Sequence, residues 1–191
     1  LNFCIVTYSI DMKSLRLKLE SLHPGKVLKS LVENNRRQMG FSGATVYEVS
    51  AIWEEQAKVQ DLFVKEISLK GPTEQSARMK FERNIRSYFN EIFFLTEIAP
   101  SLREAGVSIP NSIFIEQDSD GSADEAQFLF ISESMTGRGE QLAEFSTPQF
   151  SACIDTMARI HALYQDSVES LHGLWPIGTH LALSHRPSGE L

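Results

Sequence analysis

The sequence has little cysteine, no excess of basic residues and no long apolar run. Only Cys4 and Cys153 occur in 191 residues, without metal-ligand spacing, which argues against a disulfide framework or a zinc site and favours a reducing compartment. The 18 basic residues are outnumbered by 25 acidic ones, giving a net charge of −7, which disfavours nucleic acid and anionic membranes as partners. The apolar start, 1–10, is too short to span a bilayer. We therefore expect a cytoplasmic protein that binds neither nucleic acid nor a membrane.

The length and composition are those of an ordinary globular chain. Hydrophobic residues make up 42% of the sequence and charged residues 23%. A chain of this size can bury one solid core, or one small lobe and the start of a second. The first methionine is Met12, so no initiator opens the sequence. This absence predicts that the sequence is part of a longer protein.

Apolar periodicity predicts an α+β fold with about five strands and one long helix inserted among them. A leading helix from Met12 is expected to end at His23-Pro24-Gly25. Strand-like runs cover 40–53, 62–69, 112–117 and 128–131, and the last is apolar throughout, which predicts a central strand. The strongest helical pattern lies between 73 and 103, where apolar residues recur every three or four positions: Phe81, Ile85, Tyr88, Ile92, Leu95 and Ala99. A second helical region should start with Thr147 as N-cap and Pro148 as its first helical residue.

A glycine-containing turn lies where two strand-like runs meet, at Gly40-Phe41-Ser42-Gly43. Glycine has no side chain to keep backbone N–H groups away from phosphate oxygens, and the hydroxyls of Ser42 and Thr45 could add donors. The complete spacing G-x-G-x-x-G is absent, and a plain tight turn is the alternative. The turn is thus a candidate phosphate-binding loop.

Lys65 lies inside an apolar strand, between Val64 and Ile67. An ammonium group in such surroundings is costly unless it is paired, so we expect it to hold nucleotide phosphates and to be held by a carboxylate from the following helix. The alternative is a lysine on the solvent face of an edge strand. Glu66, the next residue, is expected to point to the opposite face of the sheet.

Glu91 is the preferred partner for Lys65, and Glu82 is the second choice. The two glutamates are nine residues apart on the predicted helix, which is two and a half turns, so they cannot share a face. Glu91 is bracketed by Phe89 and Ile92, whereas Glu82 lies between charged residues and suits a solvated surface. His161, on the second helical region, is expected to have a packing or capping role rather than a catalytic one.

These pieces, taken in order, resemble the kinase-like phosphotransferases that act on small molecules, including the choline kinase, aminoglycoside phosphotransferase and ecdysteroid kinase-like families. The segment Phe89-Asn90-Glu91-Ile92-Phe93-Phe94 is similar to their Phe-x-Glu-Ile-x-Phe-Tyr pattern. Ile109-Pro110 and Leu129-Phe130-Ile131-Ser132-Glu133-Ser134-Met135 resemble their strand and hinge, with Ser134 in place of the usual aspartate. Met157 to Tyr164 resembles their Leu-Ala-x-Leu-His-Ala-x-Tyr/Trp helix. The resemblance covers about 30–178.

The resemblance implies a protein-kinase-like small lobe, an antiparallel sheet with one long helix, and the first helical part of a truncated large lobe. It divides the chain into an N-terminal extension with a helix (1–30), the small lobe with its hinge (31–135) and the start of the large lobe (136–191). ATP and Mg²⁺ would be the cofactors and a small-molecule alcohol the acceptor. The residues that would contact the nucleotide are Gly40, Ser42, Gly43, Thr45, Lys65, Glu91, Glu133 and Met135.

The chain departs from those families at the catalytic loop. The family motif His-Gly-Asp-x-x-x-x-Asn supplies the base and a metal ligand, and a second aspartate holds Mg²⁺. His172-Gly173 starts like that loop, but Leu174 and Thr179 stand where the aspartate and asparagine belong. We therefore expect no catalytic or metal-binding residue and little kinase activity from the chain as written. The alternatives are a non-catalytic kinase-derived module that binds nucleotide or a partner, and an unrelated α+β domain.

Overall fold

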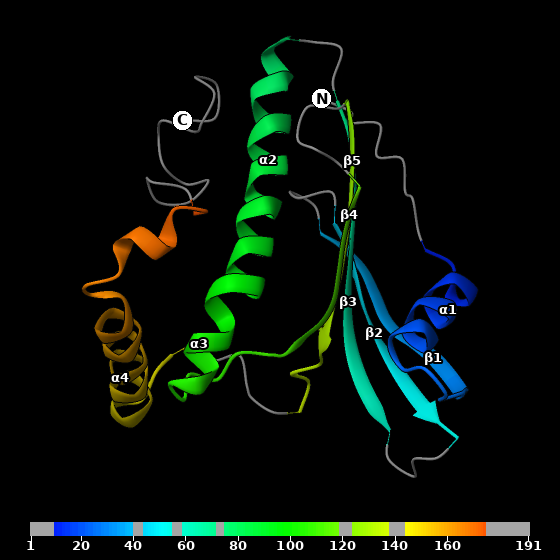
Figure 1. The fold of residues 1–191 in the computed structure, drawn as a ribbon, viewed down its shortest axis with the longest axis horizontal. Coiled ribbons are helices and arrows are strands. Elements are labelled where there is room, and N and C mark those ends of the chain that lie inside the picture. The colour runs from blue at the N-terminus through cyan, green and yellow to red at the C-terminus, as the bar shows by residue number, and fades with distance from the viewer. Residues whose placement is uncertain are drawn as a thin grey trace. The chain divides into compact units, whose positions relative to one another are not determined.

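The computed structural model describes residues 10–39, 44–54, 59–71, 75–118, 124–137 and 144–174 (Figure 1). These residues fall into two compact units. The first, here the sheet unit, takes the described residues up to Ile85 together with Asn111–Ser134. The second, here the helical unit, takes Arg86–Pro110 and the described residues from Met135 onward. One boundary falls directly after Ser134, inside the segment predicted to be the hinge.

The sheet unit contains five antiparallel strands in the order β1-β2-β3-β5-β4. Their bounds are β1 Leu28–Met39, β2 Ala44–Trp53, β3 Gln60–Lys70, β4 Ser112–Asp118 and β5 Glu125–Glu133. The expected α+β fold with a five-stranded antiparallel sheet is thus confirmed, although the sequence indicated ranges for only four of these strands and β1 was not among them. β5 lies between β3 and β4, as its apolar sequence predicted.

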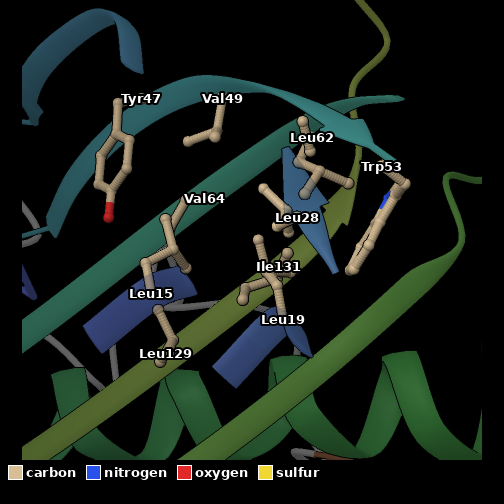
Figure 2. Packing of buried hydrophobic residues seen from close by; sticks show 11 residues of the cluster. Leu15, Leu19, Leu28, Tyr47, Val49, Trp53, Leu62, Val64, Leu129 and Ile131 are labelled. Carbon is tan, nitrogen blue, oxygen red and sulfur yellow. The ribbon is translucent and has the colours of Figure 1, made fainter. Parts of the chain in front are cut away.

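Helix α1, Met12–Leu22, packs against one face of the sheet (Figure 1). Asp11 caps it by accepting a 2.7 Å hydrogen bond from the Ser14 N–H. Leu15 and Leu19, one turn apart, are at most 1% exposed. Figure 2 shows their side chains among residues of the sheet core, which include Val64, Leu129 and Ile131. This helix, predicted to belong to an N-terminal extension with bounds 1–30, contributes directly to the core of the sheet unit.

The two faces of the sheet carry different residues because side chains alternate along each strand. The face covered by α1, here the α1 face, carries Tyr47 and Val49 of β2 and Leu62 and Val64 of β3. The opposite face carries the residues between them and is also largely buried, with Ala44, Val46, Ile67, Phe128 and Phe130 each at most 5% exposed. Phe81 and Ile85, in the part of α2 that belongs to the sheet unit, are buried as well.

The predicted helix between 73 and 103 consists of three successive segments. Helix α2 is Gln75–Phe93, a five-residue π-helical stretch, η1, covers Phe94–Ile98, and α3 is Ala99–Glu104. Pro100 stands in the first turn of α3, directly after η1. Gly106 follows the helix with a φ of +80°, a backbone conformation that favours glycine.

The helical unit has a small core around Ile98, Leu102 and Val107, against which Ile160 and Tyr164 of α4 pack. Helix α4 is Thr147–Tyr164, and its N-cap is Ser146 rather than Thr147. The Ser146 N–H donates a 2.9 Å hydrogen bond to Gln149 Oε1, which completes a capping box. The N-cap thus lies one residue earlier than predicted. A neighbouring stripe of α4 is exposed and apolar, consisting of Phe150, Ile154 and Met157.

Gly173 packs against the ring of Phe93 within the helical unit. A Cβ atom built on Gly173 would overlap the Phe93 ring carbons, and the His172 ring lies edge-on to the same ring at 5.7 Å between centroids. His172-Gly173 therefore has a packing role in this unit.

We expect Gly173→Ala to lower the free energy of unfolding by about 1–3 kcal/mol, because the added methyl group forces the ring or the backbone to move. Denaturant melts would measure the loss, and a second substitution, Phe93→Leu, should restore part of it. Equal stability of Gly173→Ala and wild type would contradict the contact.

Candidate functional site

Lys65 lies on β3, the central strand of the sheet, with β2 on one side and β5 on the other. The alternative of a lysine on an edge strand is therefore wrong. Its side chain is half-buried on the face opposite α1, between Val46 and Phe130, which are its cross-strand partners. The Nζ atom lies 5.4 Å from the centroid of the Phe130 ring, within the range of a cation–π contact. The structure thus holds an ammonium group in largely apolar surroundings.

Glu48 is a second charged residue on the Lys65 face that sequence reasoning missed. It faces Phe63 across the β2–β3 pair, so it is the diagonal neighbour of Lys65, a separation of about 7–8 Å between strands. Its Oε1 accepts a 2.9 Å hydrogen bond from the Ser134 hydroxyl. The period-two alternation with Val46 could have indicated its place on this face. The Glu48 side chain therefore links β2, the strand beside Lys65, to Ser134, the residue that follows β5.

The predicted phosphate-binding residues do not all share this face. Thr45 is directly opposite Glu66 in the β2–β3 register, which puts its half-buried side chain on the α1 face, away from Lys65. Gly40, Ser42 and Gly43 lie outside the described residues. The candidate phosphate-binding turn thus stays a prediction, and Thr45 does not join Lys65.

The two candidate carboxylate partners of Lys65 differ in their surroundings. Glu82 has a side chain 60% exposed and forms a 3.1 Å ion pair with Arg78 one turn away, so the expected surface role is confirmed. Glu91 is half-buried on the part of α2 that belongs to the helical unit, whereas Lys65 belongs to the sheet unit. The pairing of Lys65 with Glu91 stays a prediction.

The segment predicted as the hinge begins with two backbone N–H groups that are already bonded. The Glu133 N–H donates to the Asn111 carbonyl and the Ser134 N–H to the Asp61 carbonyl, each over 3.0 Å. Ser134 is 3% exposed, so this residue is an anchor of the sheet unit. Met135, which follows, is 39% exposed and is the first residue of this segment in the helical unit. The chain changes units after Ser134, and the role of this segment as a hinge stays a prediction.

A buried carboxylate, Glu66, lies on the α1 face, and its orientation away from Lys65 confirms the expected alternation. The Tyr47 hydroxyl donates a hydrogen bond to Glu66 Oε1. Arg36 Nη1 lies 3.8 Å from Oε2, and the guanidinium stacks 3.9 Å from the Tyr47 ring centroid. Glu33 pairs with the other side of Arg36 over 2.6 Å. Sequence reasoning missed this cluster because its members come from three different strands.

A bulge in β1 brings Arg36 to this cluster. The register steps from Asn34 opposite Glu48 to Arg37 opposite Val46, which leaves Asn35 and Arg36 together opposite Tyr47. Asn35 has a φ of +54°, a conformation that asparagine tolerates better than most residues. The extra residue turns Arg36 to the face of Tyr47 and Glu66.

The cluster shifts the acidity of its members in opposite directions. Burial raises the pKa of Glu66 above its ordinary value, and the Tyr47 hydrogen bond and the Arg36 charge offset only part of the rise. Burial, followed by the hydrogen bond to Glu66, raises the pKa of the Tyr47 hydroxyl. The hydrogen bond from Arg36 lowers the pKa of Glu33. The folded state therefore disfavours the charged forms of Glu66 and Tyr47 and favours the charged form of Glu33.

The described residues offer little to a metal ion. Within the described ranges no three His, Cys, Asp or Glu side chains come together as a ligand set. His161 is exposed in the last turn of α4, where a cation is favoured by the helix dipole.

No helix in the described part of the chain is both long enough and apolar enough to cross a bilayer. Comparison with protein-family models, curated proteins and solved structures gave no match.

Proposed function

We propose that this chain is the nucleotide-binding portion of a kinase-like small-molecule phosphotransferase, and that Lys65 contacts the nucleotide phosphates. The observation that carries the proposal is the position of Lys65 on the central strand of a five-stranded antiparallel sheet, among apolar residues. An ammonium group that is partly removed from water gains most from an anionic ligand. A nucleotide polyphosphate supplies that charge.

The order of elements supports the same proposal. Two strands are followed by the lysine strand β3, the long helix α2, the hairpin of β4 and β5, and then the change of unit after Ser134. This is the order that the resembling families use to cover phosphates, place the lysine and reach the hinge. The Glu133 and Ser134 N–H groups are bonded within the sheet unit, so neither is available to donate to adenine in this structure.

The chemistry proposed for this chain is binding rather than transfer. Lys65 would neutralise phosphate charge, and the apolar side chains of Val46 and Phe130 beside it would exclude water from that contact. Phosphoryl transfer also needs a residue that positions the acceptor and a metal that neutralises the leaving group. The sequence lacks the family motif that supplies the first residue and a ligand for the metal. The acceptor alcohol of the complete enzyme stays open.

Substitution of Lys65 tests the proposal, with Lys70 as a matched control on the same strand. We expect Lys65→Met to weaken ATP and ADP binding at least about tenfold, a loss of about 1.4 kcal/mol, while the melting temperature stays near that of wild type. Lys70, whose side chain is 51% exposed and paired with Glu125, should tolerate the same change without loss of binding. Isothermal titration calorimetry would give both dissociation constants. Equal nucleotide affinity of Lys65→Met and wild type would contradict the proposal.

A further inference from the structure

Glu48 brings a carboxylate to the same face of the sheet as Lys65. Its cross-strand partner is Phe63, which lies two residues before Lys65 on β3, a step of about 7 Å along the strand. Ser132 of β5 faces Phe63 from the other side. A row of a carboxylate, an aromatic ring and a hydroxyl, here the Phe63 row, therefore crosses the sheet beside Lys65.

Solvent reaches this face at Lys65 and at the Phe63 row. The side chains of Lys65 and of all three members of the row are half-buried. On the other side of Lys65 the same face is closed, because the next row across the sheet is at most 3% exposed and consists of Ala44, Ile67 and Phe128. A ligand held at Lys65 can therefore extend along β3 toward Glu48 but not toward Ile67.

The Glu48 carboxylate lies above β3. Its Oε1 accepts a 2.9 Å hydrogen bond from the hydroxyl of Ser134, which follows β5 on the far side of β3. Neighbouring strands are about 4.8 Å apart, so the short serine side chain cannot cross β3 and the longer glutamate side chain does. Oε2 lies 3.4 Å from the side-chain nitrogen of Asn35. These contacts hold the carboxylate in place, and each of its oxygens has two lone pairs, so it can also accept hydrogen bonds from a ligand.

We propose that Glu48 binds the ribose hydroxyls of the nucleotide whose phosphates contact Lys65. This inference rests on the proposed function, because it takes the phosphates to lie at Lys65. The two adjacent hydroxyls of ribose are both donors and match the two oxygens of a carboxylate. Ribose is joined directly to the phosphates, so it occupies the step from Lys65 to the Phe63 row. The amine edge of adenine matches a carboxylate less well, because the ring nitrogen beside the amine is an acceptor.

Isothermal titration of the full chain with ATP, dideoxyATP and inorganic tripolyphosphate tests the proposal. DideoxyATP lacks both ribose hydroxyls, so wild type should bind ATP at least about tenfold more tightly, since hydrogen bonds to a charged acceptor are lost. Glu48→Gln keeps an oxygen for Ser134 but replaces the other oxygen with an amide group. It should bring the ratio of the two affinities close to one without weakening the binding of tripolyphosphate. Glu125→Gln, at a side chain of the same sheet that is 63% exposed, should leave the ratio unchanged.

The outcomes separate this inference from the proposed function. Equal binding of ATP and dideoxyATP by wild type would overturn the inference alone, and this comparison decides even if Glu48→Gln does not fold. A preference for ATP that survives Glu48→Gln would also overturn it. If Glu48 served only as a counter-ion of Lys65, the substitution would change all three affinities by the same factor and leave the ratio as it was. Failure of both ATP and tripolyphosphate to bind would overturn the proposed function, and this inference with it.

Discussion

Leu15→Ala is expected to lower the free energy of unfolding by about 3 kcal/mol. Leu15 is fully buried where α1 meets the sheet, and truncation removes its apolar contacts and leaves a cavity among side chains that cannot all move to fill it. A loss of this size is a large part of the stability of an ordinary domain. Urea denaturation followed by circular dichroism would measure it.

Leu17→Ala is the matched control for this experiment. Leu17 lies on the same helix, and its replacement by alanine changes helix propensity by the same amount. Its side chain, however, is 59% exposed. We expect its substitution to change the free energy of unfolding by less than about 0.5 kcal/mol. Similar effects at Leu15 and Leu17 would mean that α1 is not part of the core.

Arg36→Met is expected to destabilise the chain by about 2 kcal/mol at neutral pH, because it leaves the buried Glu66 carboxylate without its nearest cation. Removing one partner of a fully buried pair costs about 3–5 kcal/mol, and we expect less here because the Arg36 side chain is 30% exposed. Methionine keeps much of the apolar stem that packs on Tyr47. The exposed neighbour Arg37 provides the control, and Arg37→Met should have little effect.

The cost of Arg36→Met should grow as the pH rises. The pKa of Glu66 in the folded chain is raised above its ordinary value of 4.5, so the folded state binds the proton more tightly than the unfolded state. Stability from this group is therefore fully present below about pH 4.5 and is lost as the pH rises through the folded pKa. Removing Arg36 raises that pKa further and deepens the loss. Glu33, which loses the hydrogen bond that lowers its pKa, changes stability in the same direction.

Adding Glu66→Gln to Arg36→Met separates the two carboxylates. The neutral amide no longer needs a cation, so the double variant should recover most of the loss at pH 7 and show a weaker dependence on pH. Melting temperatures of wild type, both single variants and the double variant, measured between pH 4 and pH 8, would give the coupling between the residues. Additive effects of the two substitutions at every pH would contradict the interaction.

The sequence predicted the features that depend on neighbouring residues. Apolar side chains on both sides of Lys65 indicated a buried strand, and the structure places that strand at the centre of the sheet. The spacing of Leu15 and Leu19 predicted a helix, but nothing local could show which surface covers it. Ser146 and Thr147 are adjacent hydroxyl residues, and either is a suitable N-cap by residue type. Ser146 is the N-cap in the structure because the Gln149 side chain bonds to its N–H.

Other features depend on contacts between distant strands, which a single sequence does not show. β1 was not assigned because its outer half, from Glu33 to Gln38, is polar and mostly exposed and because the bulge at Asn35 breaks the period of two. Glu66 follows Lys65 and is an ordinary charged residue by sequence. Its burial depends on Tyr47, and its ion pair depends on a register shift in β1. Periodicity cannot predict such a shift.

The central claim is that Lys65 lies at nucleotide phosphates, and covalent labelling tests it most directly. An acyl-phosphate derivative of ATP transfers its acyl group to the lysine amine nearest the phosphates, and mass spectrometry of the digested chain identifies that lysine. We predict that Lys65 is labelled first and that excess ATP suppresses this labelling. Labelling that spreads over exposed lysines such as Lys70, with no effect of ATP, would contradict the claim.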